Sequence, residues 1–110
     1  MKKICIIFGH HNSKDSFNAA IRDTFIEEAK KCGHQIDLIN LFEEEEQLPF
    51  YNSNFNPPPN IVLEYRKRLE NADIMFLIGS CHNLRLNAIL ENWIDWVLHP
   101  KWFFTYRSII

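Results

Sequence analysis

The sequence is poor in cysteine and glycine and has no excess of charge of either sign. Only three of its 110 residues are cysteine, three are glycine, and the formal net charge is −2. Three widely spaced cysteines without a CxxC pair do not form a disulfide framework, so we expect reduced thiols in a cytoplasmic protein. The nearly balanced charge excludes a strongly basic chain, and we expect neither nucleic acid nor an anionic membrane as a partner.

Long hydrophobic runs are also missing from the sequence. No apolar run approaches the roughly 18 residues that a membrane span requires. The first run, at residues 4–8, is shorter than the ~7–15 residues of a signal-peptide core, and we interpret it as a buried strand. The composition, with 46% hydrophobic residues, is typical of a compact protein, so we expect residues 1–110 to form a single domain.

What the sequence does contain is an alternation of strand-like and helix-like segments. Short apolar or alternating runs indicate three strands, at residues 3–8, 35–41 and 73–79. Apolar residues at helical spacing indicate three helices, at about residues 16–32, 60–71 and 85–98. We expect Asp15 or Ser13 to cap the first helix and Gly33 to end it. The long loop before the second helix is of a length that is usually functional or mobile.

This alternation predicts a parallel sheet with right-handed crossovers and with helices on both of its faces. The natural arrangement is an α/β fold whose strand order begins 2-1-3. In such sheets, ligands bind beyond the carboxyl ends of the strands, at the switch point between strands 1 and 3. The loops at residues 9–16 and 79–86 are therefore where we expect the functional site.

The first of these loops leads into a helix, where free backbone N–H groups and the helix dipole favour an anion such as phosphate. Suitable further donors are present on the side chains of His11, Ser13, Ser16 and Asn18. Serine and asparagine are equally common at helix starts for capping alone. From these residues, a phosphate site and a plain capped helix start both stay open.

Residues 11–18 have the arrangement His-x-x-x-x-Ser-Phe-Asn directly after the first strand. This arrangement resembles the flavin-binding loop of the NAD(P)H:quinone oxidoreductase family, whose members are flavodoxin-like flavoproteins. Residues 87–97 are similar to the family's helix pattern Pro-Ala-x-Leu-Lys-Gly-Trp-x-Asp-x-Val. Residues 103–106, Phe-Phe-Thr-Tyr, resemble the aromatic run that follows that helix. The matching segments stand in the family's order and extend over nearly the whole chain.

The resemblance implies a flavodoxin-like three-layer sandwich that binds FMN or FAD. It implies NAD(P)H as co-substrate and a quinone or similar small molecule as electron acceptor. The residues that it places around the phosphate end of the flavin are His11, Ser16, Phe17 and Asn18. We expect Asn83 and Leu84 to face the flavin ring, and Tyr106 is the candidate catalytic residue at the substrate face.

The chain departs from the family pattern at several positions. Asn87 stands where proline is usual, Glu91 stands where lysine is usual, and the 80–86 loop has neither proline nor tryptophan. The family's last two strands and a further flavin-contacting loop lie beyond Ile110, so we expect a fold that is truncated after the third β-α unit. These departures keep a second hypothesis open, a catalytically inactive, shortened subunit with a binding or regulatory role.

A three-stranded sheet also has an exposed edge at its third strand. Exposed edges pair with other chains, so we expect a homo-oligomer in which this edge or the 102–110 tail is covered.

Other chemistries have weaker support in the sequence. The side chains of His10, His11, Cys81 and His82 are suitable metal ligands, but their spacing matches no zinc pattern. Cys81 and His82 are adjacent on an extended segment and point in opposite directions, which does not favour a nucleophile and its base. A phosphoacceptor receiver domain needs carboxylates at the ends of strands 1 and 3, and none is present. The glutamates at 43–46 are typical of a solvated face.

Overall fold

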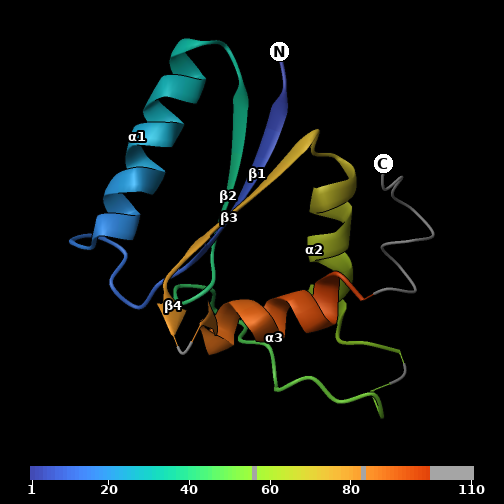
Figure 1. Ribbon diagram of the computed structural model, residues 1–110. Coiled ribbons are helices and arrows are strands. Elements are labelled where there is room, and N and C mark those ends of the chain that lie inside the picture. Colours follow the sequence, from blue (N-terminus) through green and yellow to red (C-terminus); the bar gives the residue numbers. More distant parts are fainter. Residues whose placement is uncertain (56, 83, 100–110) are drawn as a thin grey trace.

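The computed structural model describes residues 1–55, 57–82 and 84–99, in which strands alternate with helices (Figure 1). The elements in chain order are β1 (Lys3–Gly9), α1 (Phe17–Lys31), β2 (Gln35–Asn40), α2 (Asn60–Glu70), β3 (Ile74–Gly79), β4 (Cys81–His82), β5 (Arg85–Leu86) and α3 (Ala88–Val97). The strands and helices predicted from the sequence are confirmed, with small shifts at their ends. Of the helices in the described ranges, none is both long enough and apolar enough to cross a membrane.

β1 is the central strand of a parallel sheet with the order β2-β1-β3, as predicted. Ile7 of β1 pairs with Ile39 of β2 on one side and with Leu77 of β3 on the other. Every residue of β1 after Lys3 is buried. A strand that has neighbours at both edges and helices over both faces needs apolar side chains throughout, which explains its uninterrupted hydrophobic run.

The helices cover both faces of the sheet and make three layers, with α1 on one side and α2 and α3 on the other (Figure 1). On the α1 side, Ile6 and Phe8 belong to the same core cluster as Ala19. On the opposite side, Cys5 and Ile7 belong to a larger cluster. Its members from the two helices are Val62, Tyr65, Leu69, Leu90, Trp93, Trp96 and Val97. The sequence therefore folds into the predicted flavodoxin-like sandwich.

The segment after β3 differs from the prediction. Arg85 and Leu86, expected in the last helix, form β5 and pair with β4 in a short antiparallel hairpin. α3 begins only at Ala88, because the side chain of Asn87 caps it by accepting a hydrogen bond from Leu90 N at 3.1 Å. Leu86 continues the apolar spacing of α3, so periodicity alone extends the helix too far.

The N-cap of α1 also differs from the prediction. Ser16 is the cap, not Asp15 or Ser13, and its Oγ accepts a hydrogen bond from Ala19 N at 3.0 Å. The predicted end of the helix is confirmed, since Gly33 follows the C-cap residue and has a φ of 82°. That φ lies in the left-handed region, which glycine adopts most readily.

The long loop between β2 and α2 is attached to α3 around Pro49. The carbonyl oxygen of Pro49 accepts hydrogen bonds from Asn92 Nδ2 at 3.0 Å and from Trp96 Nε1 at 2.8 Å. Tyr51 N donates to Asn92 Oδ1 at 2.8 Å, and the Tyr51 ring meets Trp96 edge-on at 5.0 Å between centroids. This part of the loop is therefore held in place by α3. Glu43, Glu45 and Glu46 are exposed, as expected for a solvated face.

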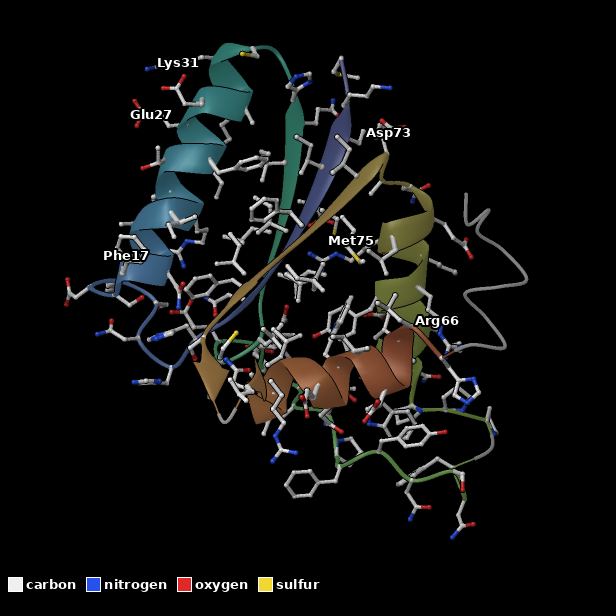
Figure 2. All side chains as sticks on the ribbon, viewed as in Figure 1. Phe17, Glu27, Lys31, Arg66, Asp73 and Met75 are labelled. Carbon is white, nitrogen blue, oxygen red and sulfur yellow. The ribbon has the colours of Figure 1, made fainter. Side chains whose placement is uncertain are left out.

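β3 is an edge strand in the part of the chain that the structure describes, with β1 as its one neighbour. Ile74 and Met75 at its start are 44% and 37% exposed, and Met75 lies beside α2 (Figure 2). The expected exposed edge is thus present within these residues.

Candidate functional site

The carboxyl ends of β1 and β3 lie side by side and are closed from one face by α3. Gly9 of β1 pairs with Gly79 of β3. A Cβ atom added to Gly9 would lie 2.5 Å from Leu90 Cγ, and one added to Gly79 would meet the same side chain even more closely. Both positions therefore need glycine because the buried Leu90 packs directly against the backbone there.

Asn87 ties these two strand ends together. Its Nδ2 donates to the carbonyl oxygen of Gly9 at 2.5 Å and to Ser80 Oγ at 3.2 Å, and its backbone N donates to Ser80 O at 3.1 Å. The same side chain caps α3. This role of Asn87 was not predicted from the sequence, although an asparagine directly before a helix is a recognisable cap signal.

The loop between β1 and α1 is shaped by its own short polar side chains. Asn12 Oδ1 accepts hydrogen bonds from Lys14 N at 3.2 Å and from Asp15 N at 2.9 Å, which closes a tight turn. Ser16 Oγ donates to Asn12 O at 2.7 Å while it accepts from Ala19 N. The hydroxyl proton of Ser16 is thus directed at the loop backbone.

The first turn of α1 presents backbone donors at this end of the sheet. An N–H group in the first turn of a helix has no helix carbonyl four residues earlier to which it can donate. The N–H groups of Phe17 and Asn18 are in this position, so they are available to an anion. The Phe17 side chain is 81% exposed at the amino end of α1 (Figure 2). The helix N-terminus predicted to bind phosphate therefore lies at the carboxyl end of β1, with an exposed aromatic ring beside it.

The two histidines after β1 lie against each other. The rings of His10 and His11 stack with centroids 4.5 Å apart, and Phe42 meets His11 edge-on at 6.5 Å. His10 Nδ1 accepts a hydrogen bond from Asn12 N at 3.0 Å. Within the described residues, no group of three or more His, Cys, Asp or Glu is arranged to hold a metal ion.

Other predicted site residues fall in or beyond the hairpin that follows β3. Leu84 is fully exposed and has a φ of 65°, a left-handed conformation that is uncommon for a bulky residue. β4 lies at the same end of the sheet as the amino end of α1 and the start of α3 (Figure 1). Asn83 and Tyr106 lie outside the described residues. Four of the predicted residues, His11, Ser16, Phe17 and Asn18, therefore lie in the loop after β1 or in the first turn of α1. Leu84 is in the hairpin at the same end of the sheet.

Arg22, a charged residue that is only 8% exposed, was not predicted from the sequence as part of this site. Its Nη2 donates to the carbonyl oxygen of Ser13 at 2.7 Å, its Nε contacts Asp23 Oδ1 at 2.9 Å, and its guanidinium lies 4.4 Å from the centre of the Phe8 ring. A signal for its burial was present, because position 22 lies on the same helical stripe as Ala19 and Ala29.

Two cavities are lined by residues outside the loop between β1 and α1. One of about 220 Å³ lies at the opposite end of the strands, where Lys3, Gln35, Asp37 and Arg68 are among its lining residues. Arg68 and Asp37 form a two-pronged ion pair there. Burial and the nearby Asp37 carboxylate raise the pKa of the Cys5 thiol to about 11. A smaller cavity of about 30 Å³ lies between the 41–48 segment, α2 and α3.

Comparison with known proteins places this arrangement in a family. A family model of the flavodoxin-like fold matches residues 2–109. The chain is 26% identical to FMN-dependent NADH:quinone oxidoreductase 4 of Burkholderia lata, with 98% of the chain and 61% of that protein covered. It is 27% identical to NAD(P)H:quinone oxidoreductase of Solanum tuberosum, with 79% of the chain and 45% of that protein covered. The chain thus spans roughly half the length of these relatives.

Solved structures show the same fold. NAD(P)H:quinone oxidoreductase from Methanothermobacter marburgensis superposes with a TM-score of 0.78 at 23% identity, with 87% of this chain and 52% of that chain covered. The flavoenzyme FerB, an NAD(P)H:(acceptor) oxidoreductase from Paracoccus denitrificans, has a TM-score of 0.73 at 25% identity, with 91% and 52% covered. These comparisons confirm the family resemblance that residues 11–18 and 87–97 indicated.

Proposed function

Because the chain belongs to the family of proteins with the flavodoxin-like fold, we propose that it binds FMN or FAD beyond the carboxyl ends of β1 and β3. We propose further that it transfers electrons from NAD(P)H through this flavin to a quinone or similar acceptor. The observation that carries the proposal is the amino end of α1, whose backbone donors and exposed Phe17 lie at the switch point of the sheet. Relatives named as quinone oxidoreductases, one of them FMN-dependent, support it.

The residues at this end of the sheet fit the phosphate end of a flavin. The N–H groups of Phe17 and Asn18 and the positive end of the helix dipole provide the setting in which proteins bind phosphate. The imidazole of His11 and the amide of Asn18 add side-chain donors next to them. Ser16 contributes as the cap that fixes the first turn, since its hydroxyl is bonded to the loop and the helix.

The apolar side chains near this end are suited to the ring of the cofactor. Phe17 and Leu84 expose large apolar surfaces, and contact with a planar aromatic ring system would remove such surface from water. We propose that Asn83 lies beside Leu84 at the ring and that Tyr106 lies at the substrate face. A bound flavin supplies the hydride and electron chemistry, while the chain's own residues bind and orient it and exclude water.

A second candidate function is that of a binding or regulatory subunit without catalysis. The observation that favours it is the loop after β3, which forms a hairpin with a fully exposed Leu84 at its turn. Flavin binding without electron transfer would distinguish it from the leading proposal.

Titration of the purified chain with FMN and FAD, followed by quenching of flavin fluorescence, tests the cofactor. Oxidation of NADH and NADPH with a quinone, compared with free flavin at the same concentration, tests the activity. Asn18→Asp places a negative charge among the phosphate donors and should abolish FMN binding. Asn54→Asp, in an exposed loop, is the matched control and should bind FMN like the unsubstituted chain. Failure of both flavins to bind would refute the proposal.

We also propose a homo-oligomer of single-domain chains in a reducing compartment such as the cytoplasm. The exposed edge of β3 supports self-association, and the exposed thiols of Cys32 and Cys81 agree with a reducing environment. Light scattering across the micromolar range tests the assembly, and a monomer at every concentration would contradict it.

A further inference from the structure

Arg22 lies beneath the loop that joins β1 to α1. Its guanidinium is sandwiched between this loop and the buried ring of Phe8, whose centre is 4.4 Å from Cζ. Its Nη2 donates to Ser13 O at 2.7 Å, so the Ser13 carbonyl is directed at Arg22. The positively charged Arg22 therefore holds the loop before α1 from its buried side.

The orientation of the Ser13 carbonyl matters for any anion bound at the start of α1. A carbonyl oxygen carries a partial negative charge, which repels phosphate when it points toward it. The hydrogen bond from Arg22 directs this oxygen away from the solvent side of the loop. The hydroxyl of the same Ser13 donates to the carboxylate of Glu43, which adds a negative charge to the surroundings of the loop. The charge of Arg22 opposes that of Glu43.

Packing alone does not account for an arginine at this position. An apolar side chain of similar length could cover Phe8 without the desolvation of a charge, and buried charges are often replaceable in this way without loss of stability. In the described part of the chain, the carboxylate that contacts Arg22 is that of Asp23, which is 62% exposed and so well screened. Arg22 therefore retains much of its charge for the loop above it.

We propose that Arg22 is a positioning residue for the flavin phosphate, because it turns the Ser13 carbonyl inward and supplies positive charge behind the 10–16 loop. This inference rests on the proposed flavin-binding function. A positioning role differs measurably from a structural one. A residue that acts on the phosphate affects the binding of FMN but not that of riboflavin, which has no phosphate. A residue that merely stabilises the fold affects both ligands alike.

The test compares the dissociation constants of FMN and riboflavin, both measured by fluorescence quenching. We expect Arg22→Met to weaken FMN binding roughly tenfold, the effect of losing one charge-assisted interaction, and to change riboflavin binding less than twofold. Arg22→Lys keeps the charge but loses the planar guanidinium, so it should lie between the two. If Arg22→Met does not fold, Arg22→Lys provides the same comparison.

Arg66→Met is the matched control. Arg66 is also a partly buried arginine that donates to backbone carbonyls, those of Trp96 and Val97, but it lies on α2, across the sheet from Phe17 (Figure 2). Its loss should lower the melting temperature without a change in the ratio of FMN to riboflavin affinity.

Each other outcome counts against the inference. If both Arg22 variants lost affinity for FMN and riboflavin equally, Arg22 would act only by stabilising the fold. Unchanged FMN binding would overturn the inference and leave the proposed function intact. A wild-type chain that binds riboflavin as tightly as FMN has no phosphate site for Arg22 to act on. A wild-type chain that binds no flavin would refute both the inference and the proposed function.

Discussion

The contact of Leu90 with Gly9 allows a quantitative prediction about the end of β1. Gly9→Ala adds a methyl group 2.5 Å from Leu90 Cγ, with the other nearby atoms of Leu90 at 3.0 and 3.2 Å. Overpacking of this kind costs about 1–3 kcal/mol of unfolding free energy. Leu90→Ala removes a fully buried side chain and should cost about 2–5 kcal/mol.

The double variant should cost less than the sum of the two changes. The three closest atoms to the new methyl group all belong to Leu90, so truncation of Leu90 removes the clash, and the methyl group fills part of the cavity. We expect a favourable coupling of about 1–2 kcal/mol, within the range found for residues in contact. Urea unfolding followed by tryptophan fluorescence measures all four free energies, because Trp93 is buried in the same core cluster.

Gly33→Ala is the control for this cycle. A Cβ atom at Gly33 has no neighbour within 4 Å, and the φ of 82° makes the substitution unfavourable through backbone strain alone. Its effect should therefore add to that of Leu90→Ala without coupling. If the losses of unfolding free energy from Gly9→Ala and Leu90→Ala also add within about 0.5 kcal/mol, then Leu90 is not the reason why glycine is required at the end of β1.

Three further predictions concern the same molecule. Glu43→Gln removes the carboxylate bonded to the loop, so it should tighten FMN binding severalfold in a fluorescence titration, and weaker binding would contradict the electrostatic argument. The thiol of Cys5 has a pKa raised to about 11 by burial and by a nearby carboxylate, and so stays protonated at pH 8. Iodoacetamide at that pH should therefore label the exposed Cys32 and Cys81 but spare Cys5, as peptide mass spectrometry would show. Asn87→Ala removes a helix cap and a link between two strand ends, and should lower the unfolding free energy by about 1–2 kcal/mol in urea; a loss below a few tenths would mean that the cap is dispensable.

The sheet was predictable because its signal is local. The buried residues of β1 form one uninterrupted apolar run, which only a strand covered on both faces requires. The placement of helices between the strands then indicated a parallel sheet with right-handed crossovers, in which the order 2-1-3 is the natural arrangement. The location of His11 and Asn18, in the loop after β1 and in the first turn of α1, followed from the same rules, because ligands bind at the switch point.

The N-cap of α1 could not be predicted because several neighbouring residues have a similar capping propensity. Ser13, Asp15 and Ser16 are all good caps, and the turn closed by Asn12 decides among them in favour of Ser16. Position 22 lies on the buried stripe of α1, but patterns of polarity assign arginine to the surface, so the burial of Arg22 was not predicted. Its partners, an aromatic ring and a carbonyl oxygen, come together only in the folded chain.

The attachment of Pro49 to α3 has a consequence for proteolysis. Phe50 is 87% exposed and is a residue type that chymotrypsin cleaves after, yet its neighbours on both sides are held by hydrogen bonds to Asn92 and Trp96. A protease must draw several residues into an extended strand in its own cleft, which here means breaking all of these bonds and separating Tyr51 from Trp96. The rate of chymotrypsin cleavage after Phe50 therefore measures how often the loop around Pro49 is released from α3.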